Sequence, residues 1–216
     1  MRDTYHEELD AVTDRLVRLT QLVRTAMARA TTALLDADLQ AAESVITGDA
    51  EVNRLNDETE EATLELMALQ QPVAKDLRTL VTSMQMASEL ERMGDLAVHI
   101  AKIARRRHPD SAVPQQLRPI ILEMGTTAEL LITKTGTVIA THDDELAKEL
   151  EGDDDRMDAL RTQLLTRILS SGWQHGVEPA VDLTLAGRYF ERYADHAVHV
   201  AHNMIYVITG EKHEED

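Results

Sequence analysis

Hydrophobic residues recur at helical spacing along most of the 216-residue chain. The first stripe steps by three or four positions, which places its members on one helix face; they are Leu9, Val12, Leu16, Leu19 and Val23. Two further stripes consist of Leu55, Leu64, Leu66 and Leu69, and of Leu77, Leu80, Val81, Met84, Leu90, Ala97 and Ala101. No segment shows the convincing alternation of apolar and polar residues that indicates a strand. The pattern therefore predicts an all-α protein.

Sparse prolines and turn-forming segments divide this pattern into six long helices. The helices are expected at 4–44, 50–70, 73–107, 114–141, 143–171 and 178–209. The clearest linker is HPDSAVP, residues 108–114, between the third and fourth helices. Because a helix of about 30 residues is roughly 45 Å long, we expect an elongated molecule.

An internal repeat organises the six helices. ERMGDLAVHIA at 91–101 returns as ERYADHAVHVA at 191–201, with seven of eleven letters identical. Two shorter segments return in the same order: GDAEVNRL at 48–55 resembles DDDRMDAL at 153–160, and PVAKDL at 72–77 resembles PAVDL at 179–183. We interpret the chain as two copies of a three-helix unit, residues 1–108 and 114–210, each with antiparallel helices joined by short turns.

Composition and charge narrow the functional classes. Only 3% of residues are aromatic, so the core must be aliphatic, and the chain has no cysteine, which excludes disulfides, thiol catalysis and cysteine zinc sites. A net charge of −17 disfavours binding to nucleic acid or anionic lipid. The N-terminal MRDTYHEELD lacks a signal-peptide pattern, and no apolar run approaches the length of a membrane span.

Both copies of the repeated helix carry an acidic pair four residues apart, Glu91 with Asp95 and Glu191 with Asp195. Residues at this spacing are neighbours on one helix face, about 6 Å apart at Cβ. Two like charges there are mildly destabilising unless a cation lies between them. One such pair in an acidic chain is a weak signal, and its recurrence at the matched position is a stronger one.

A second pair of oxygen-bearing side chains lies at the start of each unit's second helix, and in the second unit both members are acidic. Asp154 and Asp158 have the same spacing, and Asp49 and Asn53 take the matching positions. Because the second and third helices of a unit run antiparallel, these side chains should face the pairs above. The two expected clusters are Asp49, Asn53, Glu91 and Asp95, and Asp154, Asp158, Glu191 and Asp195. Oxygen donors suit Mg²⁺, Ca²⁺, Mn²⁺ and iron; the alternative is a solvated acidic face screened by arginines.

Histidines extend the same helix faces. His99 and His199 lie four residues beyond Asp95 and Asp195 and are therefore candidate ligands, with a packed or surface histidine as an equal alternative. His196 and His202 match Leu96 and Lys102 in the other copy, which favours a packing or surface role. No glutamate is followed three residues later by histidine, which disfavours a ferritin-like di-iron enzyme. Phosphate-binding glycine loops and a Gly-x-Ser-x-Gly elbow are also absent.

Several of these motifs together resemble the PhoU family of regulators of phosphate uptake. They are the helix LERMGDLAVHIA at 90–101 with its second copy, the turn PVAKDLR at 72–78 and the aspartate-rich start of the second helix. The resemblance covers nearly the whole chain, and the content of Ala, Arg and Asp resembles that of an actinobacterial member. The second copy departs from the pattern, since PAVDL lacks the arginine and ERYADH has alanine for glycine.

The resemblance implies a fold of two pseudosymmetric three-helix bundles. It also implies that the two acidic clusters bind metal ions, sometimes as multinuclear iron centres, with iron, zinc, manganese and magnesium left open. Family members are cytoplasmic, often homodimeric, and not known as enzymes. They restrain phosphate-starvation signalling by contacting the phosphate transporter, expected here at its ATPase subunit, and a sensor histidine kinase. They bind no nucleic acid and reach the membrane only through these partners.

Two other functional classes stay open at this point. A metal-dependent helical hydrolase would need an open coordination position and a base, for which the sequence offers only His199. A helical scaffold without metal would need neither. Asn53 stands where the second copy has Asp158, so the two predicted metal sites are unequal.

Overall fold

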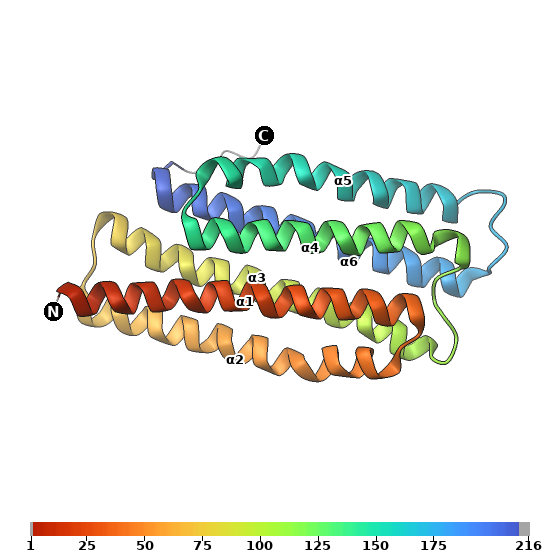
Figure 1. The fold of residues 1–216 in the computed structure, drawn as a ribbon, viewed down its shortest axis with the longest axis horizontal. Helices are drawn as coiled ribbons and strands as arrows, with labels where there is room; N and C mark the ends of the chain where they lie inside the picture. The colour runs from red at the N-terminus through yellow and green to blue at the C-terminus, as the bar shows by residue number, and fades with distance from the viewer. Residues whose placement is uncertain (1, 212–216) are drawn as a thin grey trace.

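The computed structural model describes residues 2–211, and within that range it contains helices and no strand. The six long helices are α1 (Arg2–Asp36), α2 (Leu39–Gln70), α3 (Ala74–Arg107), α4 (Arg118–Thr141), α5 (Asp144–Ile168) and α6 (Val177–Thr209), with a short 3-10 turn at Gln115–Leu117 before α4. They run along the length of an elongated molecule (Figure 1). The predicted all-α class, the six helices and the pair of three-helix bundles are confirmed.

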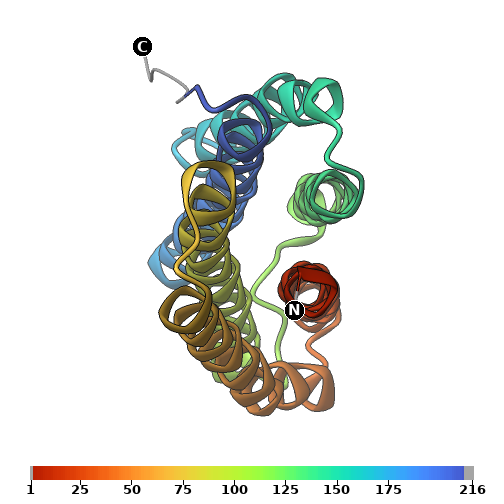
Figure 2. The ribbon, with the colours of Figure 1, turned by 90° about the vertical axis from the view of Figure 1, so that its left-hand side faces the viewer.

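The two bundles join along two pairs of helices. α1 packs on α4 and α3 packs on α6, while α2 contacts chiefly α1 and α3, and α5 contacts chiefly α4 and α6. Seen from one end, α2 and α5 therefore lie at the outer edges of the molecule (Figure 2). One aliphatic core runs through both bundles, so the two halves form a single packed body. Within the described residues, none of the helices combines the length and apolar character needed to cross a bilayer.

The boundary between the first two helices was predicted wrongly. The sequence pattern suggested a turn at 44–50, where Gly48 interrupts the stripe, but α1 ends at Asp36 and α2 begins at Leu39. Asp38 makes the turn, since its side chain accepts a hydrogen bond from the Ala41 backbone N–H at 3.0 Å and caps α2. Ala37 adopts a left-handed conformation with φ of 52°. A single capping aspartate, without glycine or proline, is a weak signal in sequence.

Part of the predicted apolar stripes is also wrong. The first stripe is buried from Val12 to Val23 and partly buried at Leu9, but Leu64 and Leu69 on α2, and Leu77 and Val81 on α3, are exposed. The buried face of α2 includes Thr59 and Thr63 instead, whose hydroxyls donate to backbone carbonyls one turn earlier and so need no other partner. Binary patterning counts threonine as polar and therefore misplaced this face.

α3 and α6 run antiparallel and are held at both ends of their contact. At one end the carboxylate of Asp182, which is only 4% exposed, pairs with Arg106 and lies 3.7 Å from Arg107 Nε. At the other end Arg78 donates to the Val207 carbonyl at 3.1 Å. A buried carboxylate without its arginines would be costly, so these pairs fix the register of the two helices.

The α1–α4 contact depends on two glycines of α4. A Cβ built on Gly125 would lie 2.5 Å from Thr31 Cγ2, and one built on Gly136 would lie 2.7 Å from Thr20 Oγ1. Real side chains do not approach so closely, so the helices could not keep this separation with any larger residue.

We predict that Gly125→Ala destabilises the protein, because the added methyl group forces α1 and α4 apart. Overpacking of this kind costs about 1–3 kcal/mol, and a chain of this size loses about 2–4 °C in melting temperature per kcal/mol. Gly48→Ala is the matched control, since nothing lies within 4 Å of its added Cβ. Both substitutions gain about 1 kcal/mol of helix propensity, so the difference between the two variants isolates the overpacking cost. Thermal unfolding would contradict the assignment if Gly125→Ala melted at or above the temperature of Gly48→Ala.

Candidate functional site

The first acidic cluster lies between the first half of α2 and the middle of α3. Asp49 and Asn53 are neighbours on α2, and Asn53 Nδ2 donates to Asp49 Oδ2 at 3.4 Å. A Cβ built on Gly94 would lie 3.3 Å from Asp49 Oδ1, so glycine leaves room for the carboxylate against α3. Asp49 Oδ1 and Asn53 Oδ1 are both buried without a hydrogen-bond partner. Because both oxygens lie on one helix face and accept no hydrogen bond, they are available to coordinate a cation.

Charge repulsion accompanies this burial. Burial, followed by the nearby Asp95 carboxylate, raises the pKa of Asp49. The same two causes, in the same order, raise the pKa of Glu91. Arg92 offers the nearest cation, 3.8 Å from Glu91 Oε2 and 3.3 Å from Asp95 Oδ2, but its side chain is 62% exposed and so screens weakly. The first cluster therefore has little internal compensation for its negative charge.

The second cluster lies between α5 and α6 and is more strongly perturbed. Burial, followed by the charges of Asp195 and Asp158, raises the pKa of Asp154 to about 7. Burial and then Glu191 raise the pKa of Asp195. Asp154 Oδ1 is buried without a hydrogen-bond partner. The structure thus brings these four carboxylates into one interacting group.

Two arginines distinguish the second cluster from the first. Glu191 Oε2 lies 2.6 Å from Arg188 Nη1 and 2.9 Å from Arg161 Nε. Both arginines therefore form close ion pairs with one and the same carboxylate oxygen. The matching positions of the first repeat are Ser88 and Asn56. The second cluster therefore combines one more carboxylate with two partly compensating cations.

The donor set of both clusters fits a hard or borderline metal ion. It consists of carboxylate and amide oxygens, several of them buried and unpaired. The carboxylates are spread along the helices, however, and within residues 2–211 neither cluster brings three acidic or histidine ligand atoms within 4.8 Å of one another. An ion there would be held by converging side chains, or several ions would share the face.

The two predicted histidines lie at the margins of the clusters. The charges of His99 and His199 lower the pKa of Asp49 and Asp195, respectively, against the stronger effect of burial. The ring of His99 stacks on Tyr189 with centroids 5.0 Å apart. His199 Nδ1 lies 3.8 Å from Glu89 Oε2. Both rings therefore belong to the contact between α3 and α6 rather than to the carboxylate groups.

Sequence reasoning missed Glu89 and undervalued His196. His196 Nδ1 and Glu89 Oε2 are 2.5 Å apart, although 107 positions separate the two residues in the chain. The available signal was the spacing of three residues between His196 and His199 on α6. His196 was expected to have a packing or surface role because Leu96 occupies the matching position, and only His199 was taken as a candidate ligand. Their carboxylate partner follows only from the α3–α6 register.

Comparison with known proteins gives a consistent result. The family model for the PhoU domain matches residues 16–104 and 121–204. "Phosphate-specific transport system accessory protein PhoU homolog 2" of Mycobacterium tuberculosis is 46% identical over 210 residues, which cover 97% of this chain and 99% of that protein. Homolog 1 of Mycobacterium leprae is 44% identical, covering 100% and 97%.

Solved structures agree in fold. The phosphate transport system regulatory protein PhoU from Streptococcus pneumoniae superposes with a TM-score of 0.87 at 25% identity, covering 98% of this chain and 100% of that one. PhoU from Pseudomonas aeruginosa superposes with a TM-score of 0.85 at 24% identity, covering 96% and 100%. The mycobacterial relatives are consistent with the actinobacterial character of the sequence.

We predict that the metal-free protein loses stability as pH rises. The pKa of Asp154 is about 7 when folded and ordinarily 3.8, so the folded state holds this proton more tightly than the unfolded state. Its contribution is full below about pH 4 and is lost as pH rises through 7. Urea unfolding at several pH values, with chelator present, should show this loss.

Asp154→Asn should flatten the profile, because the amide stays neutral throughout. Asp14→Asn, on the exposed face of α1, changes the net charge equally and should leave the profile unchanged. Parallel pH profiles for wild type and Asp154→Asn would show that Asp154 is not the group responsible.

Proposed function

This chain belongs to the PhoU family, and we propose that it acts as a regulatory accessory protein of phosphate transport. The observation that carries the proposal is the 46% identity, over nearly all of both chains, with a relative named as a phosphate-specific transport system accessory protein. The fold supports it, since a neighbour named as a phosphate transport system regulatory protein superposes over its full length. These relatives are named for accessory and regulatory roles, and we propose a non-enzymatic role here.

We propose two protein partners, the ATPase subunit of the phosphate transporter and a sensor histidine kinase. Regulation is negative, so that binding restrains uptake and phosphate-starvation signalling when phosphate is plentiful. Exposed apolar side chains on α2, α3 and the turn between them support docking by helix faces away from the acidic clusters; they include Leu64, Leu69, Val73, Leu77 and Val81. A homodimer and a cytoplasmic location complete the proposal, with the membrane reached only through these partners.

The two acidic clusters are proposed to bind divalent or trivalent metal ions, with iron, zinc, manganese and magnesium as candidates. Asp49, Asn53, Glu91 and Asp95 would hold ions at the first cluster. Asp154, Asp158, Glu191 and Asp195 would do so at the second. A bound cation neutralises paired carboxylates and so links α2 to α3, or α5 to α6. The raised pKa values of Asp49 and Asp154 support this need for positive charge.

We predict that loss of this protein raises phosphate uptake in cells supplied with ample phosphate. Uptake of labelled phosphate should rise in a deletion strain and return to normal with the wild-type chain. Uptake that stays restrained in the deletion strain would contradict the proposed role. A pull-down from the complemented cells identifies the partners, and recovery of neither the ATPase subunit nor the kinase would count against the adaptor mechanism.

We predict that Glu191→Ala/Asp195→Ala lowers the metal content of protein purified without chelator. The matched control is Glu61→Ala/Glu65→Ala, an exposed pair on α2 with the same four-residue spacing and charge. Elemental analysis should show fewer ions per chain in the first variant and no change in the second. Equal metal content in all three proteins, or none in the wild type, would contradict metal binding at the second cluster.

A further inference from the structure

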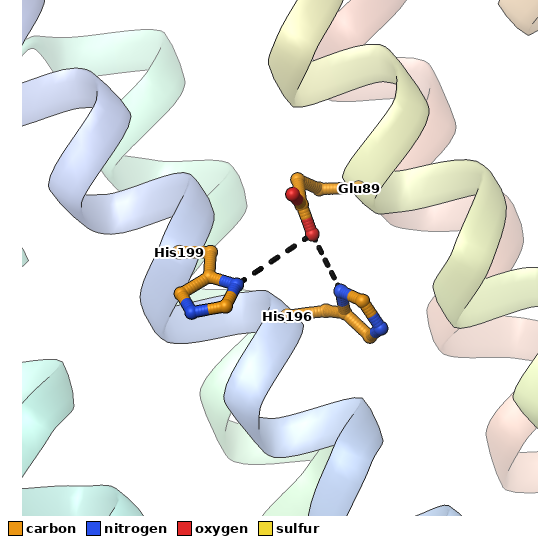
Figure 3. A group of neighbouring side chains, drawn as sticks. All are labelled: Glu89, His196 and His199. Carbon is orange, nitrogen blue, oxygen red and sulfur yellow. Dashed lines mark hydrogen bonds and ion pairs between the residues drawn. The ribbon is translucent and has the colours of Figure 1, made fainter.

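One group of side chains bridges the two bundles without belonging to either acidic cluster. Glu89 projects from α3 towards His196 and His199, which lie one turn apart on α6 (Figure 3). Glu89 Oε2 is 2.5 Å from His196 Nδ1 and 3.8 Å from His199 Nδ1. Within residues 2–211, this is the only trio of acidic or histidine residues whose ligand atoms all lie within 4.8 Å of one another.

The internal repeat supplies a built-in comparison. Exchanging the two halves turns Glu89 into Tyr189, His196 into Leu96 and His199 into His99. The equivalent contact is indeed formed, since the ring of His99 stacks on Tyr189. The His99–Tyr189 contact contains one histidine and no carboxylate, so this copy of the backbone arrangement forms only an aromatic contact. The Glu89–His196–His199 trio therefore depends on the side chains at these three positions and does not follow from the repeated fold.

The donor atoms match a borderline transition metal. Two imidazole nitrogens and one carboxylate oxygen are a ligand set that zinc uses in proteins, with bonds of about 2.0–2.2 Å. Tetrahedral geometry at those bond lengths places ligand atoms about 3.3 Å apart. The separations of 2.5 Å and 3.8 Å between Glu89 Oε2 and the two histidine nitrogens lie on either side of that value, so small rotations of side chains would suffice. Histidines three residues apart on a helix already share one face.

The carboxylate of this trio is already held by one of the two histidines. His196 Nδ1 and Glu89 Oε2 form a hydrogen bond at 2.5 Å, whereas His199 Nδ1 lies 3.8 Å from the same oxygen, beyond hydrogen-bond distance. A metal would replace one short Glu–His hydrogen bond with bonds to all three residues.

The site is open to solvent on one side. Glu89 and His199 line a surface pocket of about 770 Å³ between α3 and α6, whose wall continues along Arg78, Gln85 and Tyr206. An ion could enter from this pocket, and a water molecule could complete a tetrahedral shell there. His196 is the most enclosed of the three, with 13% of its side chain exposed.

We propose that Glu89, His196 and His199 form a binding site for one divalent transition metal ion of the zinc class, linking α3 of one bundle to α6 of the other. This site differs from the acidic clusters in its nitrogen donors and in its position between the bundles. Occupancy would add a link between two helices that also share apolar contacts, the ion pairs of Asp182 at one end and the hydrogen bond from Arg78 at the other.

Zinc titration of untagged, chelator-stripped protein by calorimetry tests the site. Wild type should bind one more equivalent than His196→Leu, which installs the residue found at the matching position of the other repeat. His202→Lys is the control, since it installs the residue matching Lys102 and lies outside the trio; it should keep that equivalent. Far-ultraviolet circular dichroism verifies that each variant is folded.

A second measurement separates this site from the oxygen-only clusters. Co²⁺ in a tetrahedral site with nitrogen donors gives a strong visible absorption band. The band should appear with wild type and with Glu191→Ala/Asp195→Ala, and should be absent with Glu89→Gln and with His196→Leu. Equal zinc stoichiometry in wild type and His196→Leu, or a cobalt band that persists in Glu89→Gln, would overturn the proposal and leave the trio as a hydrogen-bonded contact.

Discussion

The antiparallel contact between α3 and α6 is the constraint on which the rest of the structure depends. These are the two copies of the repeated helix, so one packed surface must serve both bundles at once. The contact is formed along the helices by Glu89 with His196, by His99 stacked on Tyr189, and by Arg106 with Asp182. Because one face of each helix packs in the α3–α6 contact, the acidic residues lie on another face, which is turned towards α2 in α3 and towards α5 in α6. Fold and acidic clusters are therefore consequences of one arrangement.

The acidic clusters carry a cost that packing does not recover. Like charges four residues apart each cost a few tenths of a kcal/mol at the surface of a helix, and partial burial increases the penalty. The two repeats differ in how nearby positive charge offsets the repulsion between their carboxylates. The second places Arg161 and Arg188 beside Glu191, whereas in the first Asp49 lies next to an amide and no arginine forms an ion pair with it. The two clusters should therefore differ in cation affinity for reasons beyond the replacement of Asp158 by Asn53.

Sequence reasoning recovered what is periodic and what is repeated. Helical spacing gave the fold class, and the duplicated ERxxD segment located the paired carboxylates within it. It misplaced the boundary between α1 and α2, because that turn depends on the single capping residue Asp38. It also misplaced the buried face of α2, because Thr59 is buried with its hydroxyl donating to a backbone carbonyl of the same helix. It could not find the partnership of Glu89 with His196, because that contact follows from the register between two distant helices.

The central claim is that the duplicated carboxylates are cation sites rather than a solvated acidic face. Anomalous X-ray diffraction from crystals grown with Mn²⁺ tests it most directly, since the signal locates the metal itself. The account predicts anomalous peaks at both clusters, beside Glu91 with Asp95 and beside Glu191 with Asp195. A well-ordered crystal that shows no peak at either cluster, or peaks only between neighbouring molecules, would contradict it.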